Sequence, residues 1–127
     1  MKVTFFTLDG DDVRTHVTDT PPWEPFEEWE GEPLKGVELV RLQEVPRAEI
    51  QQVMIRAGGH FVMHTSPDLA WCQIVRGRGV LALPDGAELP YEGPELYVFE
   101  PGTLHEWKDI SEDTLLTTVL IRRPSDA

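Results

Sequence analysis

The sequence lacks several features that mark whole classes of protein. It has a single cysteine, so no disulfide can form within the chain, which agrees with a reducing compartment. No stretch approaches the roughly 20 apolar residues of a membrane span, and the N-terminal MKVTFFTLDGDD turns acidic before a signal-like apolar core can form. We therefore expect a cytoplasmic protein that does not enter membranes, with Cys72 as a small buried residue.

Basic residues are scarce. Eleven Lys and Arg stand against 23 Asp and Glu, and the resulting net charge of −12 would repel a phosphate backbone. The chain also has no phosphate-cradling glycine loop, no Gly-x-Ser-x-Gly elbow and no paired CxxC. These absences argue against nucleic acid as a partner and against the common hydrolase and redox templates.

The 127 residues, of which 40% are hydrophobic and 27% charged, suit one globular domain with a real core. We divide it into residues 1–35, an N-terminal strand and an acidic aromatic arm, and residues 36–127, the main body of the same domain. Prolines and glycines in PPWEPFEEWEGEP (21–33) forbid a long helix and favour an extended arm. Its aromatic residues have two open roles, packing on a neighbouring surface or covering the mouth of a pocket: Trp23, Phe26 and Trp29.

From residue 36 onward the sequence consists of short apolar runs separated by Gly, Pro and Asp. Runs rich in Val, Ile, Leu, Thr and aromatics predict β-strands. They cover residues 36–42, 50–57, 60–64, 71–75, 79–84, 95–100 and 113–123. Turn residues stand at 58–59, 77–79 and 84–86, where hairpins need them. The pattern predicts an all-β antiparallel sandwich or small barrel.

The run HFVMH carries two histidines. Because side chains alternate along a strand, His60, Val62 and His64 are expected on one side. If that side faces the interior, two imidazoles enter a cavity, and His105 supplies a third. Three histidines in a barrel suit transition metals such as Zn, Ni, Mn or Fe. We expect the cavity to be lined further by Val62, Ala70, Cys72, Ile74 and Trp107.

The spacing of these residues resembles the first motif of the cupin superfamily, which reads glycine, five residues, histidine, one residue, histidine, three or four residues, glutamate, six residues, glycine. Gly58, His64 and Gly77 occupy matching places, while Ser66 and Ala70 stand where the motif has its second histidine and its glutamate.

The second cupin motif ends in proline, one residue, glycine, two residues, histidine, three residues, asparagine. Gly102 and His105 match it, with Glu100 and Asp109 at the proline and asparagine places and Pro101 one position late. The resemblance spans roughly residues 36–122. It implies a cupin-type jelly-roll β-barrel with the acidic N-terminal arm attached.

The resemblance also implies a site. The cupin metal site uses both histidines and the glutamate of the first motif with the histidine of the second, and this chain retains His64 and His105. Asp68 and His60 are weaker candidate ligands. A divalent transition metal, Zn, Ni, Mn or Fe, would be weakly held. Small cupins resemble one another in pairing through sheets, so a homodimer is expected, with Trp71, Gln73 and Val75 facing outward.

Three functions stay open. The first is a metal-dependent enzyme acting on a small oxygenated organic molecule, as a dioxygenase, isomerase, lyase or decarboxylase. The second is a non-catalytic module that binds a small ligand without a tightly held metal. The third is an interaction protein whose acidic aromatic arm docks on a partner. Metal analysis of the purified protein would separate the first two.

Overall fold

The computed structural model describes residues 1–123, and its regular elements are β-strands throughout this range. They are β1 (Lys2–Asp9), β2 (Asp12–Asp19), β3 (Glu24–Pro25), β4 (Glu28–Trp29), β5 (Glu32–Pro33), β6 (Lys35–Val45), β7 (Ala48–His64), β8 (Leu69–Ala82), β9 (Glu88–Glu92), β10 (Glu95–Phe99) and β11 (His105–Ile121). No helix in residues 1–123 has the length and apolar character needed to cross a membrane.

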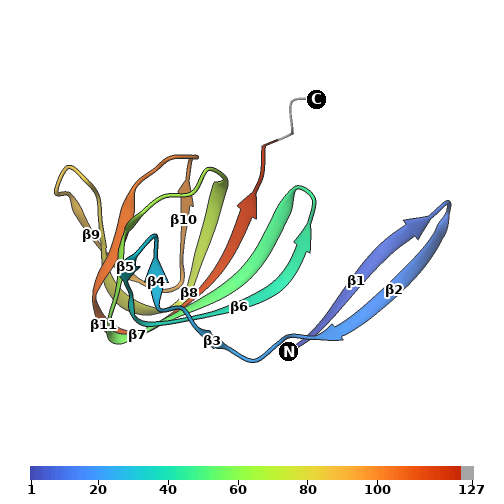
Figure 1. Cartoon of the computed structure of the whole chain (residues 1–127), viewed down its shortest axis with the longest axis horizontal. Coiled ribbons are helices and arrows are strands. Elements are labelled where there is room, and N and C mark those ends of the chain that lie inside the picture. The colour runs from blue at the N-terminus through green and yellow to red at the C-terminus, as the bar shows by residue number, and fades with distance from the viewer. Residues whose placement is uncertain (124–127) are drawn as a thin grey trace.

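The main sheet is antiparallel, with the strand order β10-β8-β11-β7-β6-β3, and β9 pairs with β8. The all-β expectation is correct. Within residues 1–123, however, no ladder joins the two ends of this order, so the sheet is open rather than a closed barrel. The long strands β7, β8 and β11 instead curve the sheet back over its own inner face (Figure 1).

Neighbouring strands of the main sheet bend at about the same height, and glycines leave room for the backbones to approach there. A Cβ on Gly59 would lie 2.7 Å from the carbonyl oxygens of both Lys35 and Arg56. A Cβ on Gly77, whose φ is +117°, would lie 2.5 Å from Thr114 Cα. The ladders between β7 and β11 and between β11 and β8 shift register in the same zone. Close backbone approach at these glycines therefore lets the strands fold the sheet.

This bend corrects two of the predicted turns. Residues 58–59 and 77–79 are not hairpin turns, because they lie inside the continuous strands β7 and β8. The runs predicted as separate strands on either side of them are therefore parts of one strand each. Only residues 84–86 fall in a connection, between β8 and β9.

The core lies inside the curved sheet. Ile55 and Ile74 have no exposed surface, and Trp107 is 2% exposed. A buried hydroxyl pair also lies in this region, where the Tyr91 and Thr114 side-chain oxygens are 2.7 Å apart and Thr114 donates to the Glu112 carbonyl. The core is thus apolar, and the buried hydroxyl groups of Tyr91 and Thr114 satisfy each other within it.

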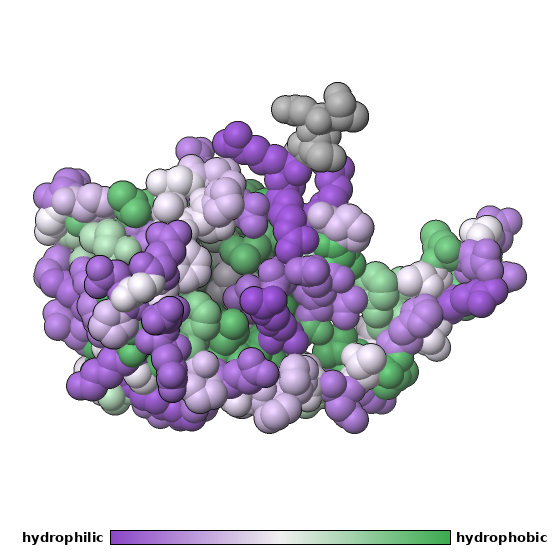
Figure 2. Space-filling view, viewed as in Figure 1, coloured by the Kyte–Doolittle hydropathy of each residue, from purple (hydrophilic) through white to green (hydrophobic). Residues whose placement is uncertain are grey.

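The extended arm was predicted for residues 21–33, whereas residues 2–19 before it form two strands, of which the sequence indicated only the first. β1 and β2 form a hairpin around Gly10, which stands apart from the main sheet (Figure 1) and exposes hydrophobic residues (Figure 2). After it, β3 adds to β6, and β4 pairs with β5. The alternation in residues 12–19 supports a second strand that the acidic composition concealed.

Candidate functional site

A cavity of about 240 Å³ opens on the inner face of the main sheet. Most of its wall is apolar or aromatic. The lining residues are Phe26, Trp29, Val37, Leu39, Arg41, Gln51, Val53, Phe61, His64, Thr65, Ser66, Ala70, Cys72, His105, Trp107, Leu116, Thr118 and Leu120. A mainly hydrophobic pocket with a few convergent polar groups is the usual form of a small-molecule site.

The two histidines lie together at one wall of this cavity. His64 is the last residue of β7 and pairs in register with His105, the first residue of β11. Their ring centroids are 4.3 Å apart. Each ring also stacks on a phenyl group, His64 on Phe61 at 4.0 Å and His105 on Phe99 at 3.9 Å. Strand pairing and stacking together fix both imidazoles.

Backbone contacts fix the tautomer of each ring. His64 Nδ1 donates to the Val62 carbonyl at 2.7 Å, and His105 Nδ1 donates to the Thr103 carbonyl at 3.0 Å. Since a carbonyl oxygen only accepts, each Nδ1 carries the hydrogen, and a neutral ring then presents an Nε2 lone pair. Burial lowers the pKa of both, that of His64 to about 4 with the neighbouring His105 as a second cause. At neutral pH the pair is two hydrogen-bond acceptors.

The other residues expected beside His64 face elsewhere. Between the pairs His64–His105 and Phe61–Trp107, β7 uses three steps where β11 uses two, so the side-chain alternation is broken. Phe61 lines the cavity in place of Val62. His60 points to the other side, where its Nε2 lies 2.5 Å from Glu106 Oε2. The predicted common face of residues 60, 62 and 64 is therefore wrong.

The remaining predicted residues divide between the cavity and its surroundings. Ala70, Cys72 and Trp107 line the cavity, whereas Ile74 is fully buried in the core beneath it. Asp68 is not among the lining residues, and its backbone N–H donates to Ser66 Oγ in a tight turn. Burial raises the pKa of the Cys72 thiol to about 11, and its Sγ contacts Thr118 Oγ1 at 3.4 Å, so this cysteine is a neutral wall residue.

Several residues that line the cavity were not predicted as site residues from the sequence. Phe26 and Trp29 pack against the core and line the cavity, with the Trp29 and His64 ring centroids 5.5 Å apart, so the packing role left open for these aromatics is confirmed, at the cavity wall. Trp23 is 40% exposed and does not line it. Arg41 and Gln51 form a register pair that continues to Thr118. Alternation with Leu39 on β6 and with Val53 on β7 was the available signal for this pair.

The donor set does not fit a resident transition metal. Such sites take three or four protein ligands, usually with a carboxylate or thiolate among them when the metal is firmly held. In the part of the chain that the structure describes, no group of three His, Cys, Asp or Glu side chains is placed to hold an ion. Ala70 stands where the resembling motif has glutamate, and the weaker candidates His60 and Asp68 do not complete the set.

No family model matches the sequence, and no curated protein matches it. Solved structures do match in fold. A cupin 2 conserved barrel domain protein from Rhodopseudomonas palustris aligns with a TM-score of 0.70 at 15% identity, over 97% of this chain and 82% of that one. The Cnp3 cupin domain of Schizosaccharomyces pombe gives 0.70 at 11% identity, over 96% and 88%.

A predicted oxalate decarboxylase from Thermotoga maritima gives a TM-score of 0.68 at 19% identity, over 80% of this chain and 92% of that one. Identities this low report shared architecture and leave ligand and reaction to the residues of each site. With its curved antiparallel sheet and its paired histidines on the inner face, this chain has the fold of the small cupin proteins.

Proposed function

We propose that this protein binds a small, mostly apolar organic molecule that carries a hydroxyl or phenol group, and that it does so without a metal ion. The observation that carries this proposal is the fixed tautomer of the histidine pair. With both Nδ1 atoms committed to backbone carbonyls, His64 and His105 offer two Nε2 acceptors to the cavity. A hydroxyl group can donate a hydrogen bond to such an acceptor. A carboxylate has no hydrogen to donate and would be repelled by the two Nε2 lone pairs.

The rest of the cavity supports the same ligand class. Its volume of about 240 Å³ and its apolar wall suit a compact ring or branched hydrocarbon. Phe26 and Trp29 supply flat surfaces for stacking above it. Arg41, whose Nε is 3.5 Å from Glu49 Oε1 and whose side chain is 69% exposed, marks a polar rim. A second polar substituent on the ligand would be accommodated there.

We favour binding over catalysis, whether by a histidine general base or by a metal ion. A general base works best with a pKa near the working pH, and a His64 pKa of about 4 makes it a weak base at neutral pH. Metal-dependent chemistry, which the sequence left open, needs donors beyond two imidazoles. The cupin-fold structures include proteins described as enzymes, but their activities belong to those chains.

The test uses pairs of small aromatic compounds that differ only by a hydroxyl or a methoxy group. Titration calorimetry in the presence of EDTA should detect binding of the hydroxyl member and much weaker binding of its ether. Replacing one acceptor by a ring without one, in His64→Phe or His105→Phe, should weaken the hydroxyl compound roughly 5- to 30-fold, because one hydrogen bond contributes about 1–2 kcal/mol.

His60→Phe is the matched control, because it makes the same replacement on the same strand outside the cavity. It should leave both affinities unchanged. Equal binding of hydroxyl and methoxy compounds would contradict the acceptor role. Binding that appears only when a divalent metal replaces EDTA, and disappears in His64→Phe, would favour the metal-dependent alternative instead.

A further inference from the structure

The β1–β2 hairpin has two unlike faces. On one face Arg14 binds Asp9 at 2.5 Å and His16 Nε2 lies 3.1 Å from Thr7 Oγ1. The opposite face comprises four register pairs: Lys2–Asp19 at its open end, and then Thr4–Val17, Phe6–Thr15 and Leu8–Val13, which carry no charge. Its large apolar side chains have exposed fractions of 62% for Phe6, 75% for Leu8, 64% for Val13 and 59% for Val17.

Such a hairpin is not expected to persist in water alone. Two strands without a covered apolar face are marginally stable, and the hairpin shares no ladder with the main sheet within residues 1–123. Figure 1 shows it projecting beyond β6. After Thr20 come Pro21 and Pro22, whose fixed φ angles favour an extended connection. Within residues 1–123 no other strand pairs with the hairpin, and its apolar face is left exposed.

The outer face of the main sheet is a second uncovered surface. One row of register partners runs across four strands as Val98, Trp71, Val119 and Ile50. The next row is Leu96, Gln73, Thr117 and Gln52. Neither row contains a charged residue. Trp71 is 45%, Leu96 54% and Val98 51% exposed.

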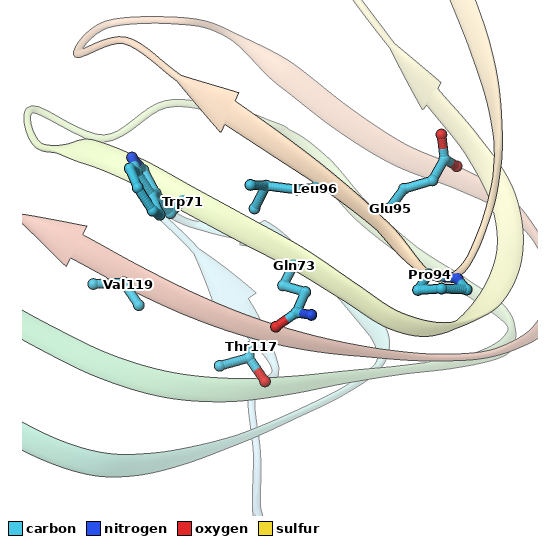
Figure 3. Close-up of a pocket in the computed structure, with 7 residues that line it drawn as sticks. All are labelled: Trp71, Gln73, Pro94, Glu95, Leu96, Thr117 and Val119. Atoms are coloured by element: carbon cyan, nitrogen blue, oxygen red, sulfur yellow. The ribbon is translucent and has the colours of Figure 1, made fainter.

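These rows border a groove of about 440 Å³ over β10, β8 and β11 (Figure 3). Of the described residues that line it, Glu95 alone is charged, and its carboxylate accepts a hydrogen bond from the Glu92 backbone N–H at the edge of the groove. The groove floor is therefore apolar or neutral. Its chemistry suits the apolar face of a two-stranded ribbon.

We propose that the hairpin of one molecule packs its apolar face on the outer sheet face of a second copy of this chain, and that the exchange is reciprocal. The chain has a net charge of −12, which opposes self-association, so a contact between two copies has to use surfaces with few charges. The three uncharged hairpin pairs and the two rows of the sheet meet this condition. A two-fold arrangement buries both surfaces of both molecules at once.

The area is sufficient for a stable pair. Taking roughly 150–200 Å² for each large apolar side chain, the exposed fractions of the four hairpin residues and of Trp71, Leu96 and Val98 amount to roughly 600–800 Å² per copy. Stable interfaces bury about 800 Å² per partner. The homodimer expected from the sequence thus acquires a specific geometry, with the hairpin as the exchanged element.

Light scattering and sedimentation of the full chain should give twice the 14.4 kDa of one chain at micromolar concentration. Leu8→Asp on the hairpin or Val98→Asp on the sheet should each weaken the dimer at least 100-fold, because each places an acid in the uncharged contact. Thr18→Asp is the matched control, since it adds the same charge to the other face of the hairpin, and it should leave the dimer intact. Circular dichroism should show the same fold for all three variants.

The double variant Leu8→Cys/Val98→Cys locates the contact. With Cys72 buried, a short bis-maleimide should join two chains, seen as a dimer band on a denaturing gel. Crosslinks confined to single chains would mean that the hairpin folds onto its own sheet. This result would overturn the proposal. So would a monomeric parent, a dimer that survives Leu8→Asp, or a dimer without interchain crosslinks.

Discussion

His60 and His64 lie four residues apart on β7 and occupy opposite chemical environments. His60 is on the outer side, with a side chain 39% exposed and a carboxylate partner in Glu106. His64 is on the inner side, stacked on Phe61 and next to His105, with no acid among the described cavity-lining residues. One histidine faces outward with a carboxylate partner, and the other lies against aromatic rings with no acid beside it.

The difference shows that a single irregularity in strand pairing decides which side chains face the cavity and which face outward. Because β7 takes one more step than β11 between two register pairs, His60 falls outside while His64 falls inside. Glu106 falls outside by ordinary alternation, because its neighbours His105 and Trp107 both line the cavity. The carboxylate that would complete a metal site is present in the next residue of the chain, but on the wrong side of the sheet. Two imidazoles without an acid are then kept neutral by burial.

The largest expected effect comes from disturbing the bend beside these residues. Gly59→Ala places a Cβ 2.7 Å from two carbonyl oxygens and should destabilise the fold by about 3 kcal/mol. Gly58→Ala is the adjacent control, because its Cβ would meet nothing within 4 Å and its φ of +78° costs only about 1 kcal/mol. Urea denaturation measures both, and equal losses would remove the close approach as the cause of the bend.

A second change supplies the missing acid on the inner side. Ala70 lines the cavity and pairs with Phe99, on which His105 stacks, so Ala70→Glu would bring a carboxylate to the two imidazoles. Zn²⁺ affinity should rise at least 100-fold, or about 2.7 kcal/mol. Calorimetry on metal-stripped protein measures it. Ala70→Gln controls for size, and a parent that already binds Zn²⁺ as tightly as Ala70→Glu would contradict the donor count.

The sequence predicted the strand composition and the meeting of two motifs, because alternation and glycine spacing are local properties. It could not predict the side on which His60 falls, because a bulge depends on the partner strand as well as on its own residues. The sequence also could not show that the glycines at 58–59 and 77–79 bend continuous strands, and they were therefore predicted as turns. Their function as bends depends on the carbonyls and side chains that approach them from other strands.

The cavity residues show the same limit. His64 and His105 were identifiable because motif spacing tied them together, and Ala70 and Cys72 followed by alternation. Phe26 and Trp29 lie far from them in sequence and reach the cavity through the two-residue strand pairing of β3 with β6. Composition described their segment as acidic, which concealed its packing. Long-range contacts of this kind leave no periodic trace in a single sequence.

The smallest expected effect is a pH dependence that separates the inner histidine from the outer one. The folded pKa of His64, about 4, lies below its unfolded value near 6.5, so the unfolded chain takes up the proton first as the pH falls. The stability contributed by keeping His64 neutral is therefore complete above pH 6.5 and is lost between pH 6.5 and about 4. The loss is on the order of 2 kcal/mol, and urea midpoints at several pH values would measure it. His64→Phe should remove this part of the acid sensitivity, whereas His60→Phe should not. If the free energy of unfolding depended on pH in the same way in the parent and in His64→Phe, the burial of a neutral imidazole would be contradicted.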